Sequence, residues 1–172
     1  MTQTINKPAI LITGGSRGIG AAVARTLARD GYSLALLDRD DVELKRVTAE
    51  LAETIVEGAD IESHVVDVTD RQAVDAAVAS TMDTFGRIDA LCNIAGVCRF
   101  DHAGDISPEL WDRVFAINVR GPFFLIQAAL PHLKESGGAI VNCASASAFF
   151  GHAYLTHYAA SKAALVNLTK SL

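Results

Sequence analysis

The stretch of sequence that decides the fold is AILITGGSRGIG, residues 9–20. Its first five residues are apolar or β-branched and predict a buried strand over 9–13, and the segment AAVARTLARDG that follows the glycines predicts a helix over 18–30. A strand, a glycine turn and a helix in this order form a cradle for phosphate. The first turn of a helix presents free N–H groups and partial positive charge, which together favour an anion.

The glycines of this turn have separate expected tasks. Gly14 allows the sharp turn, Gly18 lets a pyrophosphate approach the backbone, and Gly20 lets the helix pack closely on the strand. Three glycines in a loop are a weak signal by themselves, so the rest of the chain has to support the prediction. The dinucleotide-binding residues predicted in this segment are Gly14, Ser16, Arg17, Gly18, Ile19 and Gly20.

Short β-rich segments and longer amphipathic segments alternate along the whole chain. The alternation predicts an α/β fold, a Rossmann-type doubly wound parallel sheet with helices on both faces, in one domain over residues 1–172. The predicted strands are 9–13, 33–38, 61–66, 88–93 and 138–144. The predicted helices are 18–30, 40–56, 70–85, 107–134 and 154–172.

Composition narrows the class of protein. The chain has 172 residues, 15 Lys and Arg against 20 Asp and Glu, and a net charge of −5 without a basic cluster, which argues against nucleic acid and anionic membranes as partners. No apolar run is expected to approach the ~20 residues that span a bilayer. The N-terminal MTQTINKP lacks the build of a signal peptide, so we expect a soluble cytoplasmic protein.

Metal chemistry is not expected. Cys92, Cys98 and Cys143 include no CxxC pair, and we expect reduced thiols. His152 and His157 are five residues apart, which does not place both on one face of a helix.

An acidic residue ends the second predicted strand. Asp38 stands where a carboxylate accepts hydrogen bonds from an adenosine 2′-hydroxyl and repels a 2′-phosphate, which favours NAD over NADP. Arg17 and Arg39 are either solvated surface charges or partners of a 2′-phosphate, so NADP stays possible. Asp67 and Val68 follow the third predicted strand, and they are read either as an adenine contact or as the cap of the next helix.

A tyrosine and a lysine four residues apart carry the candidate chemistry. Tyr158 and Lys162, in YAASK, project from one face of a predicted helix. Alone, such a pair is more often a surface tyrosine beside a lysine. An adjacent ammonium and a positively charged nicotinamide both favour the phenolate, which makes the pair a proton exchanger. Ser145, at the end of the fifth predicted strand, can hold a substrate oxygen, and it lacks the G-x-S-x-G setting of a hydrolase nucleophile.

The long predicted helix contains a proline. Pro122 has no N–H to donate to the carbonyl of Asn118 four residues earlier, so we expect a kink and a free carbonyl at Asn118. This carbonyl can hold a water that relays protons between Lys162 and solvent.

These motifs together resemble the short-chain dehydrogenase/reductase family, in particular its compact single-domain enzymes. The resemblance implies a reversible alcohol/ketone oxidoreductase that transfers a hydride to or from NAD, with Tyr158 as acid and base, Lys162 on the nicotinamide ribose, Ser145 on the substrate oxygen and Asn118 in the relay. The matching elements are TGGSRGIG (13–20), Asp38, Asp67-Val68, NIAG (93–96), Asn118 in INVRG, Ser145 in IVNCAS and YAASK (158–162).

The NIAG segment adds Asn93, Ala95 and Gly96 to the predicted cofactor-binding residues, and Tyr158 and Lys162 count among them as well. Ile94 departs from the second asparagine that is common in the family. The resemblance also implies a homo-oligomer and a small alcohol or carbonyl substrate, whose identity the sequence does not reveal.

The family usually continues past the YxxxK helix with two more strands and a loop that covers the substrate. We therefore expect this chain to lack those strands, to leave its fifth strand as an exposed edge, and to be a poor enzyme by itself. A catalytically silent nucleotide-binding module is the alternative, and a scaffold that binds partners through its long helices is a third, which needs none of the site residues. A set of aromatic and histidine residues either lines a substrate site or packs: Phe100, Phe149, Phe150, His152 and Tyr154.

Overall fold

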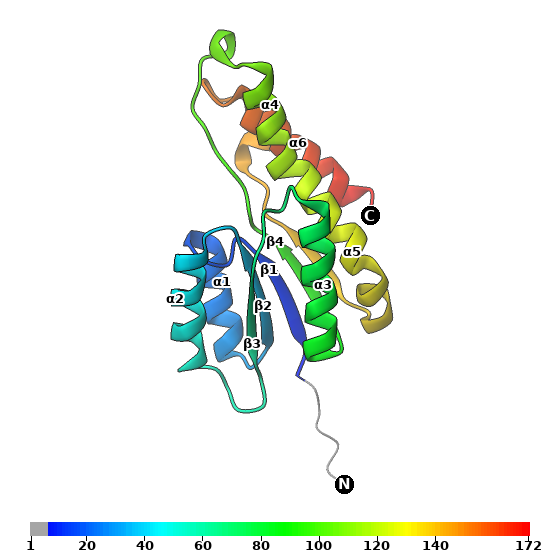
Figure 1. Ribbon diagram of the computed structural model, residues 1–172. Helices are drawn as coiled ribbons and strands as arrows, with labels where there is room; N and C mark the ends of the chain where they lie inside the picture. Colours follow the sequence, from blue (N-terminus) through cyan, green and yellow to red (C-terminus); the bar gives the residue numbers. More distant parts are fainter. Residues whose placement is uncertain (1–6) are drawn as a thin grey trace.

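The computed structural model describes residues 7–172, and Figure 1 shows its elements in chain order. The N-terminal segment on which the signal-peptide expectation partly rests, residues 1–6, lies outside the described residues. The strands are β1 (Ala9–Thr13), β2 (Ser33–Asp38), β3 (Ile61–Val65), β4 (Ala90–Asn93) and β5 (Ala139–Asn142). The helices are α1 (Gly18–Arg29), α2 (Asp41–Ala52), α3 (Arg71–Phe85), α4 (Pro108–Phe115), α5 (Gly121–Ser136) and α6 (Thr156–Lys170).

All five strands form one parallel sheet in the order β3-β2-β1-β4-β5. This arrangement confirms the predicted Rossmann-type parallel sheet. The chain leaves β1 toward β2 and β3 on one side and returns to β4 and β5 on the other, so the order reverses between β1 and β4. In open sheets of this kind, ligands bind at the carboxyl ends of the strands beside such a reversal. In Figure 1, α4 and α6 lie beyond these carboxyl ends.

Two apolar clusters cover the two faces of the sheet. Successive side chains of a strand point to opposite faces, so Leu11 belongs to one cluster and Ile12 to the other. The cluster around Leu11 includes buried residues of α3 and α5, and the cluster around Ile12 includes buried residues of α1 and α2. Figure 1 shows these helix pairs on opposite sides of the sheet. The central strands are therefore apolar on both faces, as buried parallel strands must be.

The helix predicted over 107–134 runs from Pro108 to Ser136 and is irregular near Pro122. A π-helical turn, Ala116–Arg120, separates α4 from α5, and the N–H of Gly121 donates to the carbonyl of Ala116. A proline that cannot donate and a π turn are both recognised causes of helix distortion. The helix ends at Gly137, whose φ of 67° is in the left-handed region that favours glycine.

The same helical run corrects one expectation from the sequence. By length and composition, Pro108–Ser136 is long and apolar enough to cross a membrane, although no such run was expected. The core helix of a soluble protein passes the same test. Here α5 contributes Leu125, Ile126, Ala129 and Leu133 to the cluster on the sheet, which explains its apolar character.

Several element ends differ from the predicted ranges for local reasons. The helix expected over 40–56 ends at Ala52, where the N–H of Thr54 donates to the carbonyl of Leu51, three residues earlier instead of four. The helix expected from 154 begins at Thr156, because Tyr154 has a φ of 65°. The strand expected over 138–144 is only Ala139–Asn142 and forms an edge of the sheet, as expected, with Val141 56% exposed.

Candidate active site

The glycine turn between β1 and α1 is shaped by close backbone contacts. Gly14 has a φ of 71°, and a Cβ there would lie 2.9 Å from the backbone nitrogen of Ala95. A Cβ at Gly20 would lie 2.0 Å from the carbonyl oxygen of Gly14, so α1 packs against the turn as only glycine permits. Gly18 has a φ of 52° and no atom within 4 Å of its Cβ position. The turn is therefore crowded on its inner side and open at Gly18, where a phosphate has room to approach.

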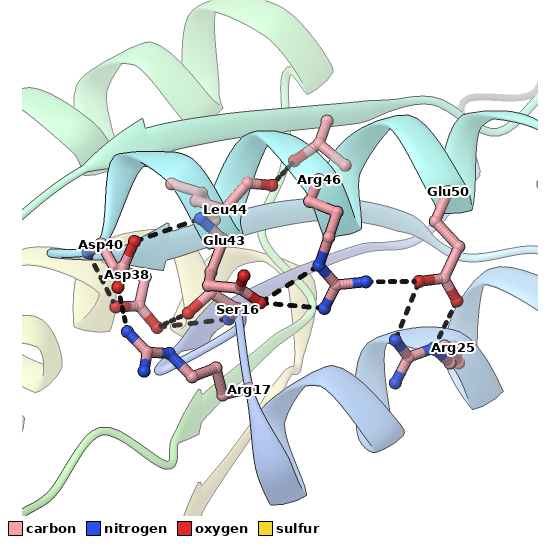
Figure 2. A network of polar contacts seen from close by, with 10 residues as sticks. Ser16, Arg17, Arg25, Asp38, Asp40, Glu43, Leu44, Arg46 and Glu50 are labelled. Atoms are coloured by element: carbon pink, nitrogen blue, oxygen red, sulfur yellow. Dashed lines mark hydrogen bonds and ion pairs between the residues drawn. The ribbon is translucent and has the colours of Figure 1, made fainter.

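Asp38 is held at the carboxyl end of β2 by its neighbours, as Figure 2 shows. The hydroxyl of Ser16 donates to Asp38 Oδ2 at 2.6 Å, and the Ser16 N–H points to the same oxygen at 3.2 Å. The N–H of Asp40 donates to Asp38 Oδ1 at 3.1 Å. These bonds fix the direction of the Asp38 carboxylate. The sequence did not indicate this role for Ser16.

Arg17 is paired with a different acid from Asp38. Its guanidinium forms an ion pair with Asp40, the residue that caps α2 by accepting from Glu43 N at 3.1 Å (Figure 2). Both arginines are exposed, and Arg39 lines the cleft described next. Of the two arginines considered for a 2′-phosphate, Arg39 is thus the one that lines this cleft.

A cleft of about 130 Å³ opens at the carboxyl ends of the strands. Among the described residues, the predicted site residues that line it are Gly14, Asp38, Asp67, Val68, Ala95 and Gly96. The sequence missed its other lining residues, Leu37, Val66, Val97 and Ile117. The remaining predicted residues of the glycine turn, together with Asn93, Asn118, Ser145, Tyr158 and Lys162, are not among its lining residues.

Asp67 sits in this cleft as a carboxylate. Its pKa is lowered mainly because it accepts a hydrogen bond from the N–H of Thr69, against partial burial, which raises it. The Thr69 hydroxyl and the charges of Arg39 and Arg113 lower it further. The helix cap in this region is a different residue, Asp70, which accepts from the first N–H groups of α3.

Asn93 is turned away from the cleft. It is 2% exposed, and its amide nitrogen donates to Asn142 Oδ1 at 2.9 Å, which ties β4 to β5. The following loop is held by Thr13, whose hydroxyl accepts from the N–H groups of Ile94 and Ala95 at 3.1 and 3.2 Å. Because these bonds use the backbone, the apolar side chain of Ile94 does not disturb them.

Lys162 is buried beside the loop that follows β4. It is 5% exposed, and its ammonium donates to the carbonyl of Cys143 at 2.6 Å. Burial lowers the pKa of Lys162, and nearby Cys143 and Cys98 oppose that shift. A Cβ at Gly96 would lie 3.4 Å from Lys162 Nζ. The Tyr158 ring lies on the same side of α6, with its centroid 5.9 Å from that nitrogen.

Asn118 lies in the π turn and connects three parts of the site. Its side chain accepts from Val97 N at 2.9 Å and donates to Val97 O at 3.0 Å and to Ser161 Oγ at 3.0 Å. Ser161 in turn donates to the carbonyl of Tyr158 at 2.7 Å. Asn118 thus fastens the loop after β4 to α6. Ser161 was missed, although its place inside YAASK was a signal.

Ser145 begins the short 3-10 helix Ala146–Ala148. Its hydroxyl oxygen accepts from Ser147 N at 3.2 Å and from Ser147 Oγ at 2.9 Å. A serine hydroxyl has two acceptor positions and one proton. With both acceptor positions used, the proton of Ser145 is directed elsewhere and can be donated to a ligand oxygen.

A buried histidine next to Tyr158 was not expected to matter. His157 is 0% exposed, and its Nε2 lies 3.4 Å from Asp101 Oδ2. The N–H of Asp101 also donates to the carbonyl of Tyr154 at 3.0 Å, so the loop after β4 is attached to the start of α6. Among residues 7–172, no group of three or more His, Cys, Asp or Glu residues is placed to hold a metal ion.

The aromatic residues named from the sequence lie near this end of α6 and are exposed. Phe100 is 73% exposed, Phe149 66%, Phe150 68% and Tyr154 50%. They do not pack into the core, and His152 is exposed as well. His102 meets the Tyr154 ring edge to face at 4.7 Å.

Comparisons with known proteins agree on one family. The profile described as short chain dehydrogenase matches residues 8–172. An uncharacterized oxidoreductase of Staphylococcus saprophyticus is 36% identical over 173 residues, covering 100% of this chain and 73% of that protein. An NAD+-bound xylitol dehydrogenase has a TM-score of 0.90 at 34% identity, covering 96% of this chain and 64% of that one.

An alcohol dehydrogenase of the archaeon Thermococcus sibiricus, complexed with 5-hydroxy-NADP, is similar to the same extent. Its TM-score is 0.89 at 32% identity, covering 96% of this chain and 69% of that one. The chain therefore spans about two thirds of the length of the proteins it matches.

Proposed function

The chain belongs to the short-chain dehydrogenase/reductase family, and from this premise we propose that it is an NAD(H)-dependent oxidoreductase that interconverts a small alcohol and its carbonyl compound. The observation that carries the proposal is the placement of Lys162. Its buried ammonium lies against the Gly96 backbone at the edge of the cleft and beside the Tyr158 ring. A buried lysine beside a tyrosine, next to a dinucleotide cleft, is an arrangement suited to proton exchange.

The residues of the cleft fit a dinucleotide. The open backbone at Gly18 and the free N–H groups at the start of α1 suit the pyrophosphate. The fixed carboxylate of Asp38 suits a ribose hydroxyl, and Asp67 and Val68 suit the adenine. When bound, the nicotinamide supplies or accepts the hydride.

The protein's own residues would handle the substrate oxygen and the proton. Ser145 donates its hydroxyl proton to the substrate oxygen and holds it in place. Tyr158 gives a proton to that oxygen during reduction and takes one during oxidation. Lys162 stabilises the phenolate by its charge and donates to the nicotinamide ribose. Asn118 holds the loop against α6, and its backbone carbonyl, which Pro122 cannot bond, accepts the water of the proton relay.

The rest of the proposal concerns preference and surroundings. NAD is favoured over NADP, because Asp38 repels a 2′-phosphate and Arg17 is engaged by Asp40. We further propose a homo-oligomer in the cytoplasm that acts on small molecules.

The test is the substitution Tyr158→Phe, assayed for NADH binding and for NAD+-dependent oxidation of a panel of small secondary alcohols. Only proton transfer is removed, so NADH affinity stays within about twofold and turnover falls by about 10²–10⁴. Tyr32→Phe removes the same hydroxyl from a side chain packed against the core, and it is expected to leave both quantities unchanged. Near-normal turnover in Tyr158→Phe would refute the assignment.

A catalytically silent nucleotide-binding module is the second candidate function. It is favoured by the exposure of Phe149 and Phe150, which follow Ser145 and leave the substrate side open. A silent module binds NADH but gives no turnover with any alcohol of the panel, and Tyr158→Phe then changes nothing.

A further inference from the structure

We infer that Asp40 sets the choice between NADH and NADPH by keeping Arg17 away from a cofactor 2′-phosphate. The inference rests on the proposed binding of a dinucleotide at the glycine turn. It assigns the preference to a pair of carboxylates: Asp38, placed for the ribose, and Asp40, which pairs with the arginine of the glycine turn.

Two contacts hold the Asp40 carboxylate in place. One carboxylate oxygen, Oδ1, caps α2 by accepting from Glu43 N at 3.1 Å, and the other, Oδ2, pairs with the Arg17 guanidinium. The Asp40 backbone N–H also donates to Asp38 at 3.1 Å. Figure 2 shows this group, with Arg17 reaching toward Asp40. The Asp40 side chain is only 31% exposed, so its carboxylate is held where it competes for Arg17.

The charges around Asp38 explain why this competition matters. A 2′-phosphate brings about two negative charges to a place that already holds the Asp38 carboxylate. Arg17 in the glycine turn and Arg39 after β2 are the cations available to offset that charge, but each already interacts with an acid. Arg17 pairs with Asp40, and the charge of Arg39 acts on Asp67. The ion pair between Arg17 and Asp40 therefore has to break before Arg17 can bind a 2′-phosphate.

The Asp38 site is built independently of this pair. Ser16 holds Asp38 through its hydroxyl and its N–H, and the Asp40 contact to Asp38 uses only the backbone. Removing the charge of Asp40 thus leaves the ribose-facing carboxylate where it is. NADH affinity and NADPH affinity should respond differently to the same substitution.

The decisive variant is Asp40→Asn, with NADH and NADPH each titrated by calorimetry against the 172-residue chain. Asn also caps helices well, so α2 keeps its first hydrogen bond. Freeing Arg17 raises NADPH affinity about two- to fivefold, and NADH affinity stays unchanged, so the NADPH to NADH affinity ratio rises by the same factor. Asp40→Ser, which also preserves the cap, gives the same result and replaces the first variant if that one folds poorly.

Two controls separate this mechanism from a general change of charge. Asp41→Asn removes one negative charge from the next position, where Asp41 pairs with Lys45 rather than with Arg17, and it leaves the NADPH to NADH ratio near the wild-type value. The double variant Arg17→Gln with Asp40→Asn loses the gain in NADPH affinity.

Three results would overturn the inference: an unchanged ratio in Asp40→Asn, an equal gain in Asp41→Asn, or a gain that persists in the double variant. If the wild-type chain binds neither cofactor, the proposed function fails and this inference fails with it. If NADH binds while the ratio stays unchanged, only this inference fails.

Discussion

Replacing Gly20 by alanine should destabilise the fold, while the same replacement at Gly18 should chiefly weaken cofactor binding. Gly20 lies in the first turn of α1, where its added Cβ would meet the carbonyl oxygen of Gly14 at 2.0 Å and the carbonyl carbon at 2.7 Å. At Gly18, by contrast, the Cβ would enter open space. The two substitutions add the same atom two residues apart in one turn.

The magnitude follows from these distances. Real Cβ atoms essentially never approach closer than 3.0 Å, so α1 and the turn have to separate by about 1 Å. Overpacking costs about 1–3 kcal/mol, and the upper end applies to Gly20→Ala because the opposing atoms are backbone. For a chain of this size, about 3 kcal/mol lowers Tm by about 6–12 °C. Gly18→Ala carries only the strain of a left-handed residue, about 1–2 kcal/mol.

The assay is thermal unfolding followed by circular dichroism, combined with NADH titration at a temperature where every variant is folded. Gly104→Ala is the control, because Gly104 has open space around its Cβ position and lies away from the turn. It should change Tm by no more than about 2 °C. A Gly20→Ala variant as stable as the wild type would refute the packing of α1 against the turn. A Gly18→Ala variant with unchanged NADH affinity would refute the role of that open backbone.

Three further outcomes are expected from the described contacts. Asn118→Ala leaves the partly buried N–H and carbonyl of Val97 without their side-chain partner and should lower the unfolding free energy by about 1–3 kcal/mol in urea titrations; a loss below about 0.5 kcal/mol would contradict this. Burial lowers the pKa of Lys162 in the folded protein below the ordinary 10.5. At pH values between the folded-state pKa and 10.5, the unfolded state therefore binds more protons than the folded state. The stability of the wild type relative to Lys162→Met should therefore rise as the pH is raised toward 10.5 in urea titrations, and a constant or falling difference over that approach would refute the sign. Val141→Lys, on the exposed edge strand, should reduce aggregation measured by light scattering without lowering Tm by more than about 2 °C, and unchanged aggregation would count against the edge as its cause.

The sequence predicts the central strands well, because their ends are chemically marked. The run AILIT stops at Gly14, and the run SLALLD stops at Asp38, so both strands have their predicted bounds. The fifth strand is shorter than predicted, and the alternation of apolar residues along the sequence does not reveal the reason. It pairs on one side only, with the four residues of β4, and the partner limits its length. The start of α6 depends on the backbone angle of Tyr154, which composition does not reveal.

Some residues that line the cleft could be predicted, because the order and direction of the strands alone determine where they lie. Asp38 ends a strand of the parallel sheet, Asp67 and Gly96 come after strands of it, and the carboxyl ends of such strands meet at one edge. The residues that hold the site were harder to predict. Ser161 and Thr13 act through hydrogen bonds between elements far apart in the chain, which depend on side-chain directions fixed only by packing. The orientation of Asn93 toward β5 is of the same kind.

The most direct test of the proposed site is amide hydrogen exchange of the 172-residue chain with and without saturating NADH. The account predicts slower exchange in residues 14–20, at the end of β2 and in the loop 94–97, with little change in α2 beyond its first turn. NADPH at the same concentration should protect the same segments less. No protection at all, or protection confined to α4 and α5, would contradict the claim that the glycine turn and Asp38 form a dinucleotide site.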